Sequence, residues 1–437
     1  MSYQPVDLVE VVAWGRRVGA AALDPTSGWY AFAYDPDWIR TGVELAPLHM
    51  PLRRQPYQFP ELPRGTFFGL PALLADSLPD AFGNALVDAW MAQQGIARDR
   101  ITPLDRLAYA ADRAMGALEF RPPARDVSDV PPTAVQLADL VLAARLTVHG
   151  RLDADEAAHT ALQQLIHVGT SAGGARAKAV VAFNPRTSQV RSSYGPHEVG
   201  FEDWLIKLDG LSAAAMDGHD DRLGDEAPYG RIEYAYALMA GAAGVEMSRC
   251  QLLAEGPRRH FMTRRFDRGE QGERHHVLSL CAMAHLDFNM TGVHSYDQYL
   301  QTVSALGLGP DALQQAYRRM VFNVMAVNRD DHTKNFAFLR RESGDWELAP
   351  AFDVTHAYNP RSRWTSRHLM SVNGKFEGIG LTDLHDVGDR NDVPAFKRCV
   401  REVRVAVDGW RDFAAAAEVS CEAAESIATD IATFRPG

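Results

Sequence analysis

Apolar and polar residues alternate along the first part of the chain. Residues 6–14, 16–23 and 29–34 read VDLVEVVAW, RRVGAAAL and WYAFAY, with breaks at Gly15 and at the turn-forming segment 24–28. Alternation with a period of two is typical of strands that have one buried face, and clusters of Gly, Pro and Asp mark turns. The pattern therefore predicts three strands near the N-terminus.

Helical spacing follows these strands. Between residues 76 and 95 apolar residues recur every three or four positions, with Ser77 as a candidate N-cap and Gly95 at the end. GALEF at 116–120 predicts a strand that returns to the sheet. The proline-bearing segment 122–132 is a candidate linker.

The rest of the chain divides into a strand-rich part and a helical part. Residues 133–167 have helical spacing, 201–210 predict a short buried strand, and 227–245 predict a helix. Residues 250–268 read as an antiparallel pair of strands, and helical patterns dominate from residue 275 onward. The order of elements predicts an α+β protein with a mixed N-terminal part and a helical C-terminal half.

Composition limits the class of protein. A chain of 437 residues is too long for one core, so two or three packed units are expected. A net charge of -11 argues against broad coating of nucleic acid. The early residues lack the features of a signal peptide, and no apolar run is long enough to span a membrane. We expect a cytoplasmic protein without a membrane partner, which fits four scattered cysteines: Cys250, Cys281, Cys399 and Cys421.

The loop GTSAGGARAK at 169–178 is compatible with several motifs. Gly169 and Gly174 have Walker A spacing, but Ala175 stands where that motif requires lysine. The segment around Ser171 also matches the G-x-S-x-G elbow of serine hydrolases, although the elbow needs a strand before the serine and a helix after it. A phosphate-cradling turn and an ordinary surface turn remain open.

The segment NRDDHTKNFAF at 328–338 places an acid and an amide five positions apart. Asp330 and Asn335 have the separation of the catalytic Asp and the metal-binding Asn of protein kinases. A loop that curls back lets the aspartate accept a hydroxyl proton while the amide oxygen binds Mg²⁺. Asp353, which follows a predicted strand, would be the second hard oxygen ligand. A solvated polar turn is the alternative interpretation.

Two more residues follow the order of kinase motifs. Lys207 ends a strand, as a phosphate-contacting lysine does, and Glu233 opens the next helix and could orient that lysine. A rival hypothesis is a metallohydrolase that uses His332 with Asp330, Asp331 and Asp353. No pair of histidines with H-E-x-x-H spacing supports this rival.

Taken together, these motifs resemble the HipA family of serine/threonine kinase toxins. The resemblance implies an α+β, two-lobed protein-kinase-like fold with an extra N-terminal α/β subdomain and an all-helical C-terminal lobe. The expected boundaries are 1–125, 126–270 and 271–437. It rests on these segments: DSLPDAFGN, GALEF, GTSAGGARAK, LIKL, IEYAYALMAGAAGV, RRFDR, NRDDHTKNFAF, APAFDV and SVNGK.

The resemblance also implies residue roles, with ATP and Mg²⁺ as cofactors. Asp330 would be the catalytic base, assisted by Lys207 and His332, and Asn335 and Asp353 would hold Mg²⁺. Ser171 would be autophosphorylated, and the added charge would repel ATP and act as an off switch. The implied ATP-binding residues are Ser171, Ala172, Gly173, Gly174, Lys178, Lys207, Glu233, Arg265, Phe266, Asp267, His332 and Lys334, with Arg265 and Phe266 at the hinge beside adenine and Asp267 near the ribose.

The implied biological role is the toxin of a toxin–antitoxin pair. Its substrate would be a translation enzyme such as an aminoacyl-tRNA synthetase, and its partner a helix-turn-helix antitoxin of HipB type that makes most of the operator DNA contact. The basic segment 361–368 could contact a substrate or DNA, or be a solvated loop. Arg264 departs from the glutamate of the family's ERFDR motif. A catalytically silent, kinase-shaped regulator is the competing hypothesis.

Overall fold

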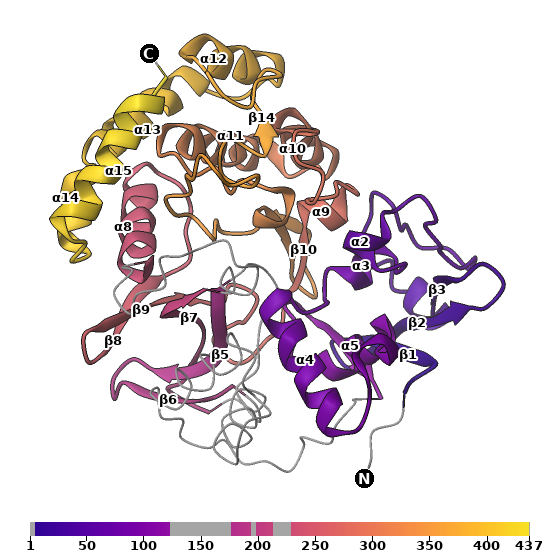
Figure 1. Ribbon diagram of the computed structural model, residues 1–437. Helices are drawn as coiled ribbons and strands as arrows, with labels where there is room; N and C mark the ends of the chain where they lie inside the picture. Colours follow the sequence, from indigo (N-terminus) through magenta and orange to yellow (C-terminus); the bar gives the residue numbers. More distant parts are fainter. Residues whose placement is uncertain (1–4, 123–175, 194–197, 213–228, 437) are drawn as a thin grey trace. The chain divides into compact units, whose positions relative to one another are not determined.

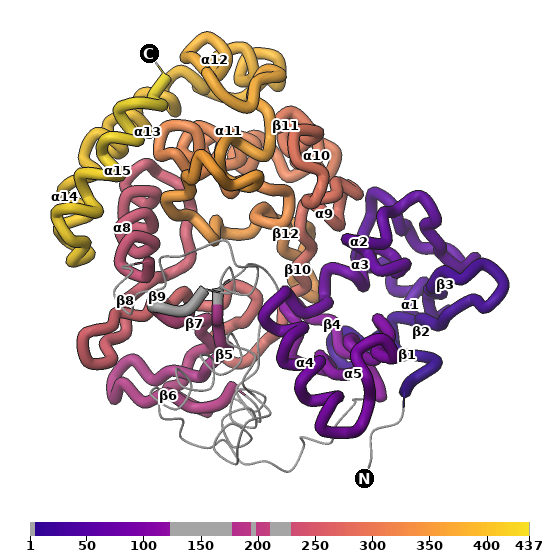
Figure 2. Tube along the Cα trace, in the orientation of Figure 1, coloured from indigo at the N-terminus to yellow at the C-terminus, as the bar shows by residue number. Residues whose placement is uncertain are grey.

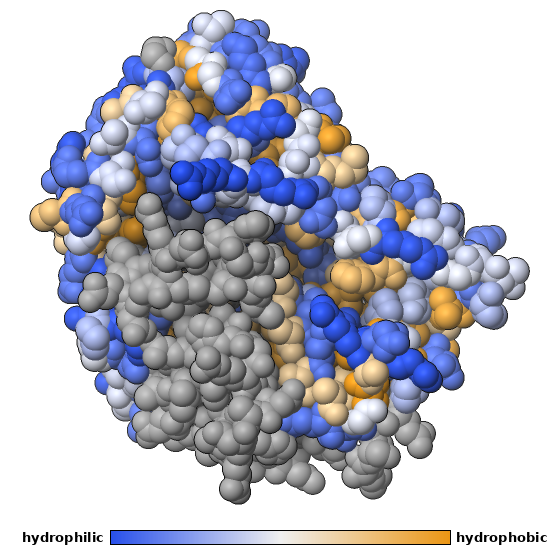
Figure 3. All heavy atoms as spheres, in the orientation of Figure 1, coloured by the Kyte–Doolittle hydropathy of each residue, from blue (hydrophilic) through white to orange (hydrophobic). Residues whose placement is uncertain are grey.

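The computed structural model describes residues 5–122, 176–193, 198–212 and 229–436 (Figure 1). The chain forms two compact units, and each is made of two stretches of sequence: 1–227 with 253–277, and 228–252 with 278–437. None of the described helices is both long and apolar enough to cross a membrane. On the face drawn in Figure 3, hydrophobic residues form separate patches among hydrophilic ones.

The first unit begins with a four-stranded antiparallel sheet. Its strands are β1 (Leu8–Ala13), β2 (Arg16–Asp24), β3 (Trp29–Tyr34) and β4 (Leu118–Arg121), in the order β3-β2-β1-β4. The three N-terminal strands and the returning strand predicted from alternation are therefore confirmed.

Five helices and one 3₁₀ turn lie between β3 and β4. They are α1 (Pro36–Ile39), α2 (Arg64–Phe67), α3 (Ala72–Ala75), α4 (Ala81–Gln93), η1 (Arg98–Arg100) and α5 (Pro103–Ala110).

The expected N-cap of α4 is wrong. Asp80 caps this helix by accepting the Gly83 amide at 2.7 Å. Ser77 instead belongs to the turn after α3, because its amide donates to the carbonyl of Leu74. Gly95, which lies two positions beyond α4, has the positive φ of 77° that glycine tolerates at a helix end.

A five-stranded sheet forms the second part of this unit. Its strands are β5 (Arg176–Asn184), β6 (Gln189–Ser192), β7 (Glu202–Ser212), β8 (Cys250–Glu255) and β9 (Arg258–Arg264), in the order β6-β5-β7-β9-β8. The buried strand and the pair of strands predicted here are confirmed, and β7 is longer than expected.

One apolar core joins α4 and α5 to this sheet. The described part of residues 1–125, which was predicted as a separate subdomain, therefore packs in the same compact unit as β5 to β9. The buried members of the core are Phe82, Leu86, Val87, Trp90, Met91, Tyr109, Ala177, Ala179, Val181, Phe183, Trp204, Ile206, Leu208 and Met262.

The second unit is mainly helical. Helix α8 (Tyr229–Ala242), predicted to belong to the middle region 126–270, lies in this unit and packs against α13 and α14 (Figures 1 and 2). Its expected inward residues Tyr236, Met239 and Ala240 are all buried. The other helices are α9 (Leu280–Met283), α10 (Tyr296–Ala305), α11 (Gly309–Met325), α12 (Leu381–Arg390), α13 (Phe396–Asp408), α14 (Trp410–Ala416) and α15 (Cys421–Phe434).

Short strands interrupt the part that was expected to be all-helical. A three-stranded sheet has the order β10-β12-β13, and β11 pairs in parallel with β14. Strand β12 directly follows the loop that carries the candidate catalytic residues. The strands of this part are β10 (His276–Ser279), β11 (His294–Ser295), β12 (Ala337–Arg340), β13 (Trp346–Leu348) and β14 (Met370–Ser371).

Candidate functional site

The candidate catalytic loop runs from the end of α11 to β12. Asn335 closes the 3₁₀ turn η3 (Thr333–Asn335), and its Nδ2 donates to the carbonyl oxygen of Asp330 at 2.7 Å. The amide of Asn335 also donates to the carbonyl of His332 at 2.9 Å. The segment therefore curls back on itself, and this turn brings Asn335 next to Asp330.

One pocket of the second unit gathers the three principal candidates. Asp330, Asn335 and Asp353 all line it, and buried Arg319 from α11 lines it as well. Asp353 has a φ of 53°, a left-handed conformation that is uncommon outside glycine. The structure therefore brings together an acid, an amide and a second acid that lie up to 23 positions apart in the sequence.

The donors of this pocket suit a hard divalent cation. Mg²⁺ prefers oxygen ligands and keeps several sites for water and phosphate oxygens. Because the Asn335 nitrogen is committed to the Asp330 carbonyl, its Oδ1 is the atom that can face a cation together with the carboxylate of Asp353. Among the residues that the structure describes, no group of three or more His, Cys, Asp or Glu could hold a metal ion.

His332 and Lys334 both lie near the aromatic ring of Phe288. His332 Nε2 is 3.7 Å from the Asp330 carboxylate, and its ring is 5.5 Å from that of Phe288. Lys334 Nζ lies 5.0 Å from the same Phe288 ring. Phe288 thus stands beside both residues, whose expected roles toward ATP stay predictions.

The lysines predicted to bind ATP lie on neighbouring strands. Lys178 on β5 is directly opposite Lys207 on β7. Lys178 is almost fully buried, and its Nζ lies 3.2 Å from Asp80. This ion pair fixes β5 to the N-terminus of α4 and favours a structural contribution of Lys178. Lys207 is also largely buried, with Nζ 5.8 Å from the ring of Phe261.

Some predicted residues lie in other places. Glu233 is buried on α8 in the second unit. The loop residues Ser171, Ala172, Gly173 and Gly174 lie outside the described residues. A strand, β5, begins directly after that loop, whereas the serine hydrolase elbow requires a helix there.

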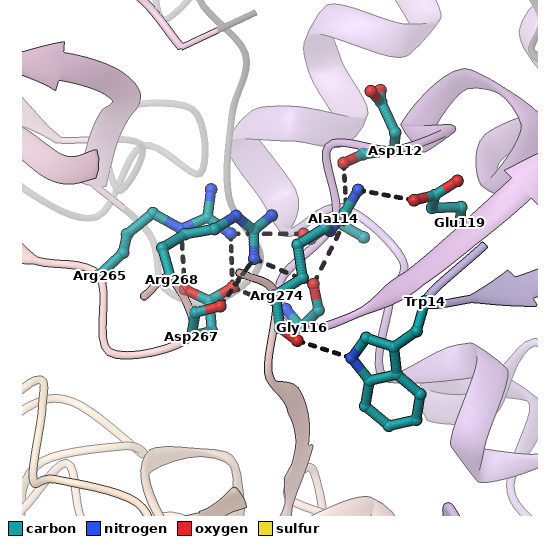
Figure 4. A network of polar contacts seen from close by, with 9 residues as sticks. All are labelled: Trp14, Asp112, Ala114, Gly116, Glu119, Arg265, Asp267, Arg268 and Arg274. Atoms are coloured by element: carbon teal, nitrogen blue, oxygen red, sulfur yellow. Dashed lines mark hydrogen bonds and ion pairs between the residues drawn. The ribbon is translucent and has the colours of Figure 1, made fainter. Parts of the chain in front are cut away.

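The hinge segment forms a buried polar network with the loop 112–116 (Figure 4). Asp267 is fully buried and accepts hydrogen bonds from Arg265 at 2.6 and 2.9 Å and from Arg268 at 2.7 Å. The Gly116 amide also donates to Asp267, at 2.8 Å. Since protein donors occupy both carboxylate oxygens, this geometry favours a structural role for Asp267 over contact with a ribose.

Two opposing effects set the pKa of Asp267 in this network. Burial alone would raise the pKa of the Asp267 carboxyl, but the guanidinium groups of Arg265 and Arg268 outweigh burial and hold that pKa well below its usual range. Arg274 extends the network by donating to Glu119 at 3.2 Å and to the Asp112 carbonyl at 2.7 Å. Because its pKa is low, the carboxyl of Asp267 is charged at neutral pH.

Sequence reasoning missed the support of the catalytic loop by the end of the chain. The guanidinium of Arg329 lies 4.5 Å from the ring of Tyr358 and 4.0 Å from that of Phe434, and it donates to the carbonyl of Ser366. Helix α15 thus contacts the residue next to Asp330. No local pattern could reveal a contact between positions about 100 residues apart.

The two units define the class of protein: the chain has the α+β, protein-kinase-like fold. It belongs to the HipA family, because residues 9–121 match the HipA N-terminal domain and residues 170–433 match the HipA-like C-terminal domain. The expected family is therefore confirmed. No curated protein matches the chain.

A solved structure that aligns over almost the whole chain shares this architecture. The structure described as the Shewanella oneidensis MR-1 toxin antitoxin system HipA, HipB and its operator DNA complex aligns at 16% identity with a TM-score of 0.63. The alignment covers 98% of this chain and 95% of that one. The Helicobacter pylori proinflammatory kinase CtkA aligns over 52% of this chain and 92% of its own, at 13% identity and a TM-score of 0.30.

Proposed function

We propose that this protein is an ATP- and Mg²⁺-dependent serine/threonine protein kinase. The observation that carries this proposal is the single pocket lined by Asp330, Asn335 and Asp353. It combines a partly exposed carboxylate that can accept a proton with two oxygen donors that can bind a hard cation. A polar turn without function would not need to bring Asp353 to the same pocket.

Each residue has a distinct task in this proposal. The carboxylate of Asp330 accepts the proton of the attacking serine or threonine hydroxyl. Asn335 and Asp353 hold Mg²⁺, which when bound neutralises charge on the phosphate oxygens. The curl that fixes Asn335 to the Asp330 carbonyl sets the spacing between the proton acceptor and the cation ligand.

The nucleotide contacts come from further residues. Lys207 contacts the ATP phosphates, and Glu233 orients that lysine, as in other kinases. The backbone at Arg265 and Phe266 contacts adenine, while the Arg265 side chain remains bound to Asp267. Autophosphorylation of Ser171 would add a charge of about -1.5 to -2 to a phosphate-binding loop and so prevent ATP binding.

The test is phosphate transfer from labelled ATP by the Asp330→Asn variant. This substitution keeps the shape of the side chain and removes the proton acceptor, so phosphorylation should fall by about 10²-fold or more while Mg·ATP binding persists. Undiminished transfer would refute the assignment of Asp330. If the unaltered protein binds Mg·ATP and transfers no phosphate to any protein in a lysate, the silent regulator is the better description.

The biological role proposed here is that of a toxin. The solved Shewanella complex contains HipA, HipB and operator DNA. It supports a helix-turn-helix antitoxin of HipB type as partner, with DNA bound mainly through that partner. An aminoacyl-tRNA synthetase is the proposed substrate, and identification of the labelled protein in a lysate would test it.

A further inference from the structure

Asp331, the neighbour of the proposed catalytic base, is a buried carboxylate with three donors. Its side chain has no exposed surface. Oδ2 accepts from the Tyr296 hydroxyl and from His368 Nδ1, both at 2.8 Å, and Oδ1 accepts from the Leu369 amide at 2.7 Å. Burying a charge is costly unless hydrogen bonds compensate it, so a carboxylate held in this way has a specific structural task.

The Tyr296 side of Asp331 is anchored in two helices. Tyr296, on α10, is fully buried, and burial together with the charge of Asp331 raises its pKa well above the usual value. It therefore remains a donor. Its hydroxyl accepts from Asn323 on α11 at 3.0 Å, and Asn323 in turn accepts from Asn328 in the catalytic loop at 2.9 Å. Both ends of this chain of contacts return to the loop that contains Asp330.

The His368 side of Asp331 fixes a different segment. His368 and Leu369 lie at the end of the stretch that follows Asp353, immediately before β14. Arg329 secures the same stretch by donating to the carbonyl of Ser366. The two residues that flank Asp330, Arg329 and Asp331, therefore attach the stretch after the cation ligand to the loop of the base.

We propose that Asp331 and His368 form a positioning pair that holds Asp330 in its reactive orientation and orders the stretch 354–369. The proposal rests on the kinase function proposed above. The pair does not touch the reacting atoms, and it acts by fixing the backbone on either side of Asp330. Because these hydrogen bonds join protein groups alone, they would hold the site in place before ATP or substrate binds.

The geometry distinguishes two substitutions of His368. His368→Asn places an amide nitrogen where Nδ1 stood and keeps the donor to Asp331, whereas His368→Gln is larger and carries its amide beyond that point. Because a misplacement of about 1 Å can cost about 10²-fold in rate, His368→Gln and His368→Ala should lower kcat by 10- to 100-fold with little change in KM for ATP. His368→Asn should recover most of the activity.

Asp331→Asn is expected to be as harmful as Asp331→Ala, because all three partners of Asp331 donate and the new amide would oppose at least one of them. The matched control is His385→Ala on α12, whose ring contacts Phe396 and which does not line the pocket of Asp330, Asn335 and Asp353. Its kcat should equal that of the unaltered protein. Equal kcat for His368→Asn and His368→Gln, or full kcat in Asp331→Asn, would overturn the proposal.

Hydrogen exchange separates this proposal from the kinase function. In the full-length protein the Leu369 amide should be protected, and Asp331→Asn should expose it and its neighbours from 361 to 369 to exchange. His368→Asn should keep that protection. This readout requires no activity, so a protein without phosphate transfer but with these exchange patterns would refute the kinase function and keep the positioning pair. Unchanged exchange in Asp331→Asn would refute the positioning pair itself.

Discussion

Single side chains in the hinge segment show what a motif can and cannot specify. The motif RRFDR predicts a hinge and a ribose contact for Asp267. The ribose contact is not favoured, because the carboxylate is fully buried among Arg265, Arg268 and Gly116. The motif specifies only the residue types at and just after the end of β9. It contains no information about a loop about 150 residues earlier that donates to the same oxygen.

Removal of the Asp267 charge should destabilise the first unit. Asp267→Asn leaves two buried guanidinium groups without their counter-charge, and loss of one partner of a buried pair costs about 3–5 kcal/mol. Urea unfolding at neutral pH would measure the loss. Arg121→Ala is the control, because its exposed pair with Glu119 is worth at most about 1 kcal/mol.

The difference in unfolding free energy between the unaltered protein and Asp267→Asn should depend on pH in a defined direction. The folded pKa of Asp267 lies below the unfolded value of about 3.9, so its stabilising effect is present above that value. It is lost as the pH falls toward the folded pKa. The stability gap between the unaltered protein and Asp267→Asn should therefore narrow below about pH 4, and a gap that widened there would contradict this account.

Elements were predictable where their own residues determine them. Strands β1 to β3 follow from strict alternation, and α8 from its apolar face, because local period fixes which side is buried. The N-cap of α4 was predicted wrongly. Ser and Asp side chains can both cap a helix, and only the turn after α3 shows that Asp80 rather than Ser77 stands at the helix start. In the candidate site, the curl from Asp330 to Asn335 followed from spacing, whereas the side chains that support it come from distant helices.

Contacts between helices give opposite predictions for two glycines. In α12, a Cβ on Gly388 would lie 2.6 Å from Phe396 at the start of α13, so Gly388→Ala should cost about 1–3 kcal/mol. In α8, a Cβ on Gly241 meets no atom within 4 Å, so Gly241→Ala should stabilise by about 0.5–1 kcal/mol. Thermal unfolding would measure both, and stabilisation by Gly388→Ala would show that the two helices can separate without cost.

At the scale of the whole molecule, the N-terminal region is part of the same compact unit as the sheet of β5 to β9. The predicted boundary at residue 125 followed a proline-rich segment, which is a sound sign of a linker. The apolar core that α4 shares with β5 and β7 could not be anticipated, because each element reads as amphipathic by itself. Sequence alone indicates that a face is apolar but does not name the element that covers it.

Removal of residues 1–121 should therefore abolish folding of the first unit. The cut would expose the face of β5 and β7 that Phe82, Leu86 and Trp90 cover. We expect the shortened protein to aggregate or to lose cooperative unfolding, as measured by calorimetry and by solubility. A sharp transition at the original Tm would mean that the sheet is self-sufficient and that the shared core contributes little.

The contact of Arg329 with Phe434 bears on synthesis at the ribosome. A nascent polypeptide that has emerged only as far as α13 already contains Asp330, Asn335 and Asp353, yet it lacks the aromatic ring that covers the guanidinium beside the base. Until α15 leaves the exit tunnel, that guanidinium can contact Tyr358 and the Ser366 carbonyl but not the ring of Phe434. The loop of Asp330 would therefore gain the support of Phe434 only after α15 has been synthesised.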